Sequence, residues 1–461
     1  MTHLKSSMYV GIVCLAALCS VAFGQSYREV KVDGALANQK DALFNSIRSG
    51  NVNADELETF LKSYYLGRWT VVDNARDLHV YRSEAQNDFA SLPAEAKAAF
   101  GAPLVKILTS YAANKECYPA CRYNAVLTLG MLDETPATGE TPSVPYAGVL
   151  KRLCDFCDSD KIPLPDYVRL GALVGIVRHA SCGIKDETMK TAVESLLLKI
   201  LTPNYAKEKN YRKDIMSWFR LKAMEGLIGL KSAAGPKGPN EVLDAFVALI
   251  NDKKESVEVR CLAARGIGAL DLSAVQNFDF ITLSEDLAKL TRDFCSEELN
   301  YIGTEALRDQ IKGGSSTSGS FGGGMMGGGM GGGMDPMGSP TQTMDDVSKA
   351  KVENIIARIK FDLDSANQAI AAVKPVLTAE QQDSIDLLDE TLAEIKKTMN
   401  YLDNGPDAVG ATPTTKPTSR AVPRKKQAAG PTGPKVDIPM IKTHLEDQVI
   451  LYNELLGIPS Y

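Results

Sequence analysis

One short phrase recurs four times along this 461-residue chain and constrains its fold more than any other feature. Each copy begins with an arginine, has an alanine three residues later, and has an apolar residue seven positions after the arginine. The copies are RYNAVLTLGML, RLGALVGIVRH, RLKAMEGLIGL and RCLAARGIGAL, which begin at Arg122, Arg169, Arg220 and Arg260. Positions i, i+3 and i+7 share one face of an α-helix, so each copy predicts a helix with a stripe of small and apolar side chains.

The small residues of this stripe predict close contact between helices. The alanines are Ala125, Ala172, Ala223 and Ala263. Glycines stand one position before or after the apolar residue, at Gly130, Gly175, Gly226, Gly266 and Gly268. Because neither residue type fills much space, a neighbouring helix can approach the stripe closely.

A second amphipathic helix is predicted before each copy. These helices cover residues 102–113, 146–157, 189–201 and 240–252, so each unit is a helical hairpin. The units recur at intervals of 40 to 51 residues, which is typical of solenoids whose hairpins bury their apolar faces only by stacking. The sequence therefore predicts an all-α fold, with a right-handed α-solenoid of helical hairpin repeats over residues 101–312.

The segments DYVRLGAL and SVEVRCLAARGIGAL, with the two weaker copies, resemble the HEAT-repeat (armadillo-like) family of α-solenoids. The resemblance covers residues 100–272, and a degenerate capping unit extends to residue 312. It implies that the four arginines pair with acidic residues near the hairpin turns and orient successive repeats, rather than bind a ligand. In this sequence, the acidic partner is clear only at Asp166.

The N-terminus has the pattern of a secretory signal peptide. Lys5 precedes an apolar run from Met8 to Phe23, and small residues surround the end of that run. This pattern predicts that residues 1–24 are a signal peptide cleaved after Gly24, and that the protein is exported to the periplasm or the extracellular space. The alternative is an uncleaved membrane anchor, but the run is shorter than the roughly 20 residues that span a bilayer.

Composition divides the rest of the chain into shorter segments. Residues 25–100 predict an N-terminal helical cap, with Asn53 and Ser91 as helix N-cap residues. The C-terminal segments are a flexible linker rich in Gly, Met and Ser (313–344), a helical hairpin (345–403), a disordered linker rich in Pro and Lys (404–436) and an amphipathic helix (437–461). Thr378 and Gln381 fit a capping box within the hairpin. The apolar face of the last helix is Ile441, Leu445, Val449, Tyr452 and Leu456.

Cysteine and methionine are the candidate metal ligands. Cys117 with Cys121 and Cys154 with Cys157 could form a four-thiolate zinc site, local disulfides, or buried small apolar side chains. Because both pairs fall in or beside predicted helices, burial is the interpretation that the pattern favours. The methionines of the 313–344 linker could hold Cu(I) through their thioethers, but a plain linker is the simpler interpretation.

No pattern in the sequence indicates catalysis or a cofactor. After signal cleavage, the histidines are His79, His179 and His444, far apart in sequence, and His179 is expected to be a structural histidine with satisfied hydrogen bonds. The net charge of −6 gives no sign of nucleic-acid binding. We therefore expect an exported, non-enzymatic scaffold or adaptor that binds a protein partner. The alternative is a periplasmic metal-handling or redox protein that uses the cysteine pairs or the methionines. The basic residues of the 404–436 linker could contact an anionic envelope surface weakly.

Overall fold

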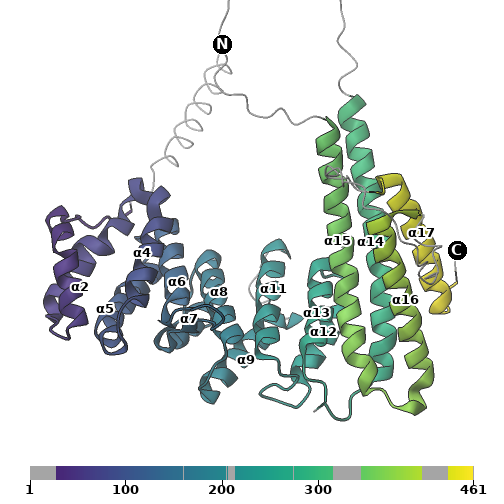
Figure 1. Cartoon of the computed structure of the whole chain (residues 1–461), viewed down its shortest axis with the longest axis horizontal. Helices are drawn as coiled ribbons and strands as arrows, with labels where there is room; N and C mark the ends of the chain where they lie inside the picture. The colour runs from purple at the N-terminus through teal and green to yellow at the C-terminus, as the bar shows by residue number, and fades with distance from the viewer. Residues whose placement is uncertain are drawn as a thin grey trace, which may run out of the picture. The chain divides into compact units, whose positions relative to one another are not determined.

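The computed structural model describes residues 27–406 and 435–459, except residues 159, 204, 206–212, 274 and 315–343. The described part is mostly helical (Figure 1), which confirms the predicted all-α class. Within it, the only strands are β1 (Asp133–Thr135) and β2 (Val144–Pro145), which pair antiparallel in the insertion after the first repeated phrase. The expected signal peptide and most of the two expected linkers lie outside the described residues.

The chain divides into two compact units, and the boundary between Leu196 and Leu197 falls inside the segment expected to form one solenoid. Unit 1 begins with η1 (Gly34–Gln39), α2 (Lys40–Arg48), α3 (Ala54–Phe60), η2 (Leu61–Tyr65), η3 (Gly67–Thr70), η4 (Val72–Asp77) and α4 (Leu78–Ala90). Aromatic side chains fill the core of this N-terminal part, among them the fully buried Phe60, Tyr65 and Trp69.

Helix caps explain two boundaries of this N-terminal part. Asn53 is an N-cap residue, as predicted, because its side chain accepts hydrogen bonds from the backbone N–H groups of Asp55 and Glu56. The prediction for Ser91 is wrong, because Ser91 ends α4. Pro93 takes the N-cap position of the next helix, which therefore begins at Ala94 and not at residue 102.

Two helical hairpins complete unit 1. Their helices are α5 (Ala94–Ala113), α6 (Pro119–Met131), α7 (Leu150–Cys157, preceded by η5, Ala147–Val149) and α8 (Asp166–Cys182), followed by α9 (Glu187–Leu201), which crosses the unit boundary. Helix α5 packs against α6, α7 packs against α8, and the second helices α6 and α8 pack against each other. They touch through backbone, since a Cβ atom added to Gly130 would lie 2.6 Å from the Cα atom of Gly175.

After α9, unit 2 contains further helices, of which α14 and α15 are the longest (Figure 1). They are α11 (Lys213–Leu230), α12 (Glu241–Asn251), α13 (Val257–Ala269), α14 (Phe280–Gly314), α15 (Met344–Val373), α16 (Gln382–Asn404) and α17 (Ile438–Leu455), with the short helices η6 (Lys374–Val376) and η7 (Ala379–Gln381) between α15 and α16. Thr378 and Gln381 form the predicted capping box at η7.

The helices on either side of residues 315–343 pack as the two helices of another hairpin would. Helix α14 packs against α12, α15 packs against α13, and α14 and α15 pack against each other. Helices α16 and α17 then pack on α14. The expected 345–403 hairpin is formed by α15 and α16, but it is packed into unit 2 through its contacts with α13 and α14. Helix α14 also extends to Gly314, into the segment expected to be linker.

Candidate functional site

The four repeated arginines are buried, and three of them bond the end of the preceding helix. In these three, the Nε–H group donates to a backbone carbonyl in the last turn of the first helix of the same hairpin. The bonds run from Arg122 to Ala112 (3.1 Å), from Arg169 to Cys157 (3.1 Å) and from Arg260 to Ile250 (2.9 Å). Carbonyls at a helix C-terminus lack intrahelical partners and carry partial negative charge, so a buried guanidinium stabilises them.

The outer nitrogens of these arginines reach other groups along the chain. Arg122 donates to the Tyr167 hydroxyl of α8 (3.2 Å), and Arg169 pairs with Asp166 (3.4 Å), the one acidic residue recognised in the sequence. Arg220 pairs with Glu255, and Arg260 pairs with Asp293 (2.8 Å) and Glu297 (3.3 Å) of α14. The sequence did not reveal these last acidic partners, because they come from the following hairpin.

The repeated alanines lie where the stripe predicted close packing. Ala125, Ala172, Ala223 and Ala263 are fully buried. Gly266 leaves room for the Phe246 ring, since a Cβ atom there would lie 2.5 Å from it. The four arginines and four alanines of the repeated phrase therefore all contribute to contacts within or between helices.

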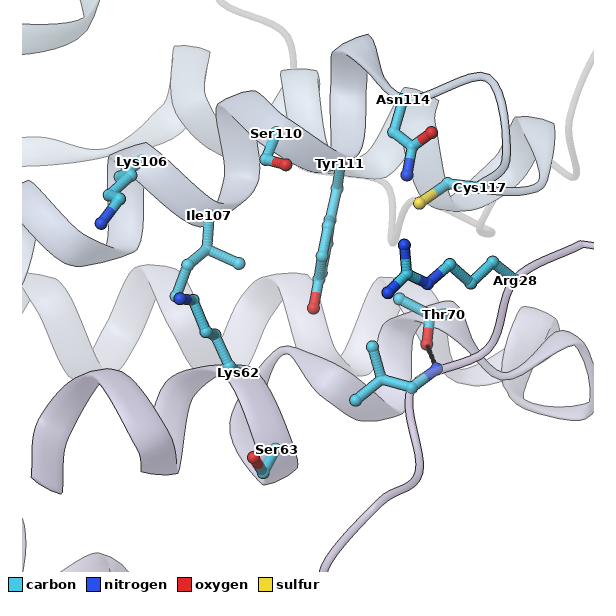
Figure 2. A pocket seen from close by; sticks show the side chains of 11 residues that line it. Arg28, Lys62, Ser63, Thr70, Lys106, Ile107, Ser110, Tyr111, Asn114 and Cys117 are labelled. Carbon is cyan, nitrogen blue, oxygen red and sulfur yellow. Dashed lines mark hydrogen bonds between the residues drawn. The ribbon is translucent and has the colours of Figure 1, made fainter. Parts of the chain in front are cut away.

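A cavity of about 440 Å³ lies in unit 1, between the N-terminal part and α5 (Figure 2). We call it the basic cavity, defined by Arg28, Lys62, Lys106, Tyr111, Asn114 and Cys117. Lys62 comes from η2, Lys106 and Tyr111 come from α5, and Asn114 and Cys117 come from the turn that leads to α6. The sequence alone does not indicate this site, because its cations come from segments far apart in the chain.

The basic cavity has more positive than negative charge around it. Lys62 and Lys106 both pair with Glu58, the latter at 3.2 Å, and hydrogen bonds from Lys62 and then Lys106 lower the pKa of that carboxyl. Arg28 lies 3.6 Å from Glu116. Neither carboxylate lines the cavity, so among the described residues its wall carries three cations and no anion.

Cys117 and Cys121 are neighbours, and Cys117 lines the basic cavity. The pKa of the Cys117 thiol is lowered, chiefly because the Cys121 thiol donates a hydrogen bond to it, while the same interaction and burial raise the pKa of Cys121. Burial raises the pKa of Cys154 to about 12. No disulfide joins the cysteines of the described residues. The described residues also contain no group of three or more His, Cys, Asp or Glu side chains that could hold a metal ion. The methionine-rich linker lies outside them.

Two further polar groups are buried without a full set of partners. His179 is buried, but the expectation that its hydrogen bonds are satisfied is wrong, because its Nε2 atom has no hydrogen-bond partner among the described residues. Burial and then Arg178 lower the pKa of His179 to about 4, so the imidazole is neutral at physiological pH. In unit 2, Asp362 of α15 is 2% exposed and accepts a hydrogen bond from the Cys261 thiol of α13 (3.0 Å). Burial raises its pKa to about 7.

Comparison of the chain with protein-family models, curated proteins and solved structures finds no match. In the part of the chain that the structure describes, no helix has the length and apolar character needed to span a membrane.

Proposed function

We propose that this chain is an exported, non-enzymatic scaffold that binds another protein through the surface of a right-handed, HEAT-like solenoid. The proposal rests on the structural roles of the four repeated arginines and the four repeated alanines. The arginines bond helix ends and neighbouring hairpins, and the alanines are buried between helices. A chain built this way offers an extended outer surface, which is how helical solenoids bind partners.

The packing on both sides of residues 315–343 supports a longer array than the sequence suggested. Helices α12 and α13 form a hairpin, and α14 and α15 repeat its contacts one step further along. Arg260 bonds across this step to Asp293 and Glu297. We therefore extend the proposed solenoid to α15, with α16 and α17 closing its C-terminal end, as terminal repeats need an atypical cap.

Trp218 is the best candidate for a partner contact within the array. It lies on α11, two residues before Arg220, and is 59% exposed. Tryptophan side chains dominate many protein interfaces, because they bury a large area at low cost in conformational entropy. Most of the Trp218 side chain contributes no burial to the fold of its own chain, and a partner that covers it would remove this apolar area from water.

Affinity capture with the mature protein tests the proposal. Wild-type protein and the Trp218→Ala variant are compared on extracts from the native envelope or medium, and Val80→Ala is the control because it removes another half-exposed apolar side chain from unit 1. The expected result is a protein retained by wild type and by Val80→Ala, and depleted on Trp218→Ala. Equal retention by all three would count against Trp218. No retained protein with wild type would count against the scaffold function.

Export is tested separately by intact-mass measurement of the protein from its native source. The expected N-terminus is Gln25, because Gly24 ends the predicted signal peptide. Retention of residues 1–24 would contradict cleavage.

A further inference from the structure

The charges of the basic cavity are arranged at two ends. Arg28 lies on one side of the Tyr111 ring, and Lys62 and Lys106 lie on the other (Figure 2). A ligand that reaches both groups of cations must therefore extend past the Tyr111 ring. The volume of about 440 Å³ falls in the range of small-molecule sites, which is roughly 300–1,000 Å³. The cavity therefore suits a ligand longer than one anionic group.

Neutral hydrogen-bond donors lie between the two ends. The Tyr111 hydroxyl bonds to no other described residue, and burial raises its pKa, so it remains a protonated donor. The Asn114 side-chain oxygen accepts from the Glu116 backbone N–H (2.9 Å), which leaves the amide N–H groups to face a ligand. Thr70 is already satisfied, since its hydroxyl accepts from Val30 (2.7 Å) and donates to Gly67 (2.8 Å).

We propose that the basic cavity binds an elongated dianion that carries a carboxylate at each end, one near Arg28 and the other near Lys62 and Lys106. The guanidinium can hold a carboxylate through two parallel hydrogen bonds, and the two ammonium groups hold the other as point charges. Tyr111 packs along the body of the ligand and donates its hydroxyl to it. Such a ligand balances the excess positive charge, because within the described part of the chain the three cations share two carboxylates, those of Glu58 and Glu116.

This inference goes beyond the proposed scaffold function and does not depend on it. Two carboxylates at a fixed separation occur in a free aliphatic dicarboxylate and in a peptide segment with two glutamates. The chemistry recognised by the cavity is the same for both, and the two sources are separated by the choice of probe.

Calorimetric titration of the mature protein tests the proposal with matched probes. Adipate and hexanoate have the same carbon chain but differ in one carboxylate, and a blocked glutamate–alanine–glutamate peptide represents the second source. Adipate or the peptide is expected to bind at least about tenfold more tightly than hexanoate, since a charge-assisted hydrogen bond is lost with one carboxylate. Raised salt should weaken this binding, because the cations at the rim are exposed.

Variants locate the binding in the cavity. Arg28→Ala and Lys106→Ala should each weaken binding about tenfold, and Tyr111→Phe, which keeps the ring, about fivefold. Lys115→Ala is the matched control, because Lys115 is an exposed cation near the same turn that does not line the cavity. It should bind as wild type does. Tighter binding of adipate identifies a free dicarboxylate, and tighter binding of the peptide identifies an acidic segment of a protein. Binding of both adipate and the peptide no tighter than that of hexanoate, no saturable binding of either dianion, or an equal loss in Lys115→Ala and Lys106→Ala would overturn the proposal.

Discussion

Two helix–helix contacts, α6 with α8 in unit 1 and α13 with α15 in unit 2, are built in the same way. The groups around the two contacts differ. In both, two helices touch through a glycine of the repeated phrase. Gly130 meets the backbone of Gly175, and a Cβ atom on Gly268 would lie 2.7 Å from the backbone of Gln368. In unit 1 the carbonyl of Gly130 accepts a hydrogen bond from Arg178 (3.3 Å). In unit 2, the contact encloses the carboxyl of Asp362.

The difference shows that two equally close helix contacts can bury different polar groups. One oxygen of Asp362 accepts from the Cys261 thiol, but the other has no hydrogen-bond partner in the described part of the chain. Glu298 and Glu258 add negative charge nearby, and Arg358 is the neighbouring cation. Burying an incompletely paired carboxylate costs free energy unless it is protonated. The α13–α15 contact should therefore depend on pH in a way that the α6–α8 contact does not.

The largest effect is expected where the buried alanine stripe of the repeated phrase is disrupted. Ala263→Arg places a long cation at a fully buried position of α13, which should destabilise unit 2 by about 4 kcal/mol or more. Ala269→Arg is the matched control, because Ala269 is exposed on the same helix, and it should change stability by less than about 0.5 kcal/mol. Urea unfolding followed by circular dichroism measures both. Similar unfolding of the two variants would contradict the burial of the alanine stripe.

The carboxyl of Asp362 gives the next effect and tests the difference between the two contacts. Its pKa is about 7 in the folded protein against 3.8 ordinarily, so its contribution to stability is full below pH 4 and is lost as the pH rises to 7. Asp362→Asn keeps an acceptor for the Cys261 thiol and cannot ionise. It should stabilise unit 2 at neutral pH by up to about 4 kcal/mol and remove this part of the pH dependence.

The control for this prediction is Glu353→Gln, at an exposed position of the same helix α15. Hydrogen exchange is measured segment by segment at pH 5 and pH 8 and corrected for the effect of pH on the intrinsic exchange rate. In wild type and in this control, α13 and α15 should open more readily at pH 8 than at pH 5. An unchanged opening equilibrium of α15 between the two pH values in wild type would refute the role of Asp362.

Glycine substitutions test the shared part of the comparison. Gly130→Ala and Gly268→Ala each drive a methyl group into the backbone of a neighbouring helix, so each should destabilise its own unit by about 1–3 kcal/mol. Gly303→Ala is the control in helix α14, because nothing lies within 4 Å of its added Cβ atom. It should stabilise the protein by up to about 1 kcal/mol, since alanine has the higher helix propensity. Thermal unfolding separates the outcomes, and stabilisation by all three alanines would show that the helices do not touch at these glycines.

The sequence predicted what depends on local periodicity and missed what depends on distant partners. The repeated stripes, the Asn53 cap and the capping box at Thr378 are encoded within a few residues, and all are present in the structure. The last helix is a mixed case. Ile441, Leu445 and Tyr452 are buried as predicted, but Gln448 is buried too, because its side chain donates to Glu394 of α16 (3.2 Å). The basic cavity and the site of Asp362 combine segments far apart in the chain, which periodicity cannot bring together.

The smallest effect concerns the repeated arginines, whose partners differ between the units. Arg122 donates to two neutral oxygens, those of Ala112 and Tyr167, whereas Arg260 bonds one carbonyl and two carboxylates. Lysine keeps the charge but has one nitrogen, so it cannot bridge partners as the guanidinium does. Arg122→Lys should cost about 1 kcal/mol and Arg260→Lys between about 1 and 2 kcal/mol.

Salt then distinguishes the two arginines. High salt should weaken wild-type unit 2 slightly through the half-exposed pair of Arg260 with Glu297, and Arg260→Lys should reduce this sensitivity. Arg122 has no carboxylate partner to screen among the residues that the structure describes, so the stability lost in Arg122→Lys should be the same at low and high salt. Urea unfolding at two salt concentrations measures both variants. A salt-dependent loss in Arg122→Lys would mean that its guanidinium acts mainly as a charge, and its bonds to the end of α5 and to Tyr167 would no longer explain why an arginine stands at this position.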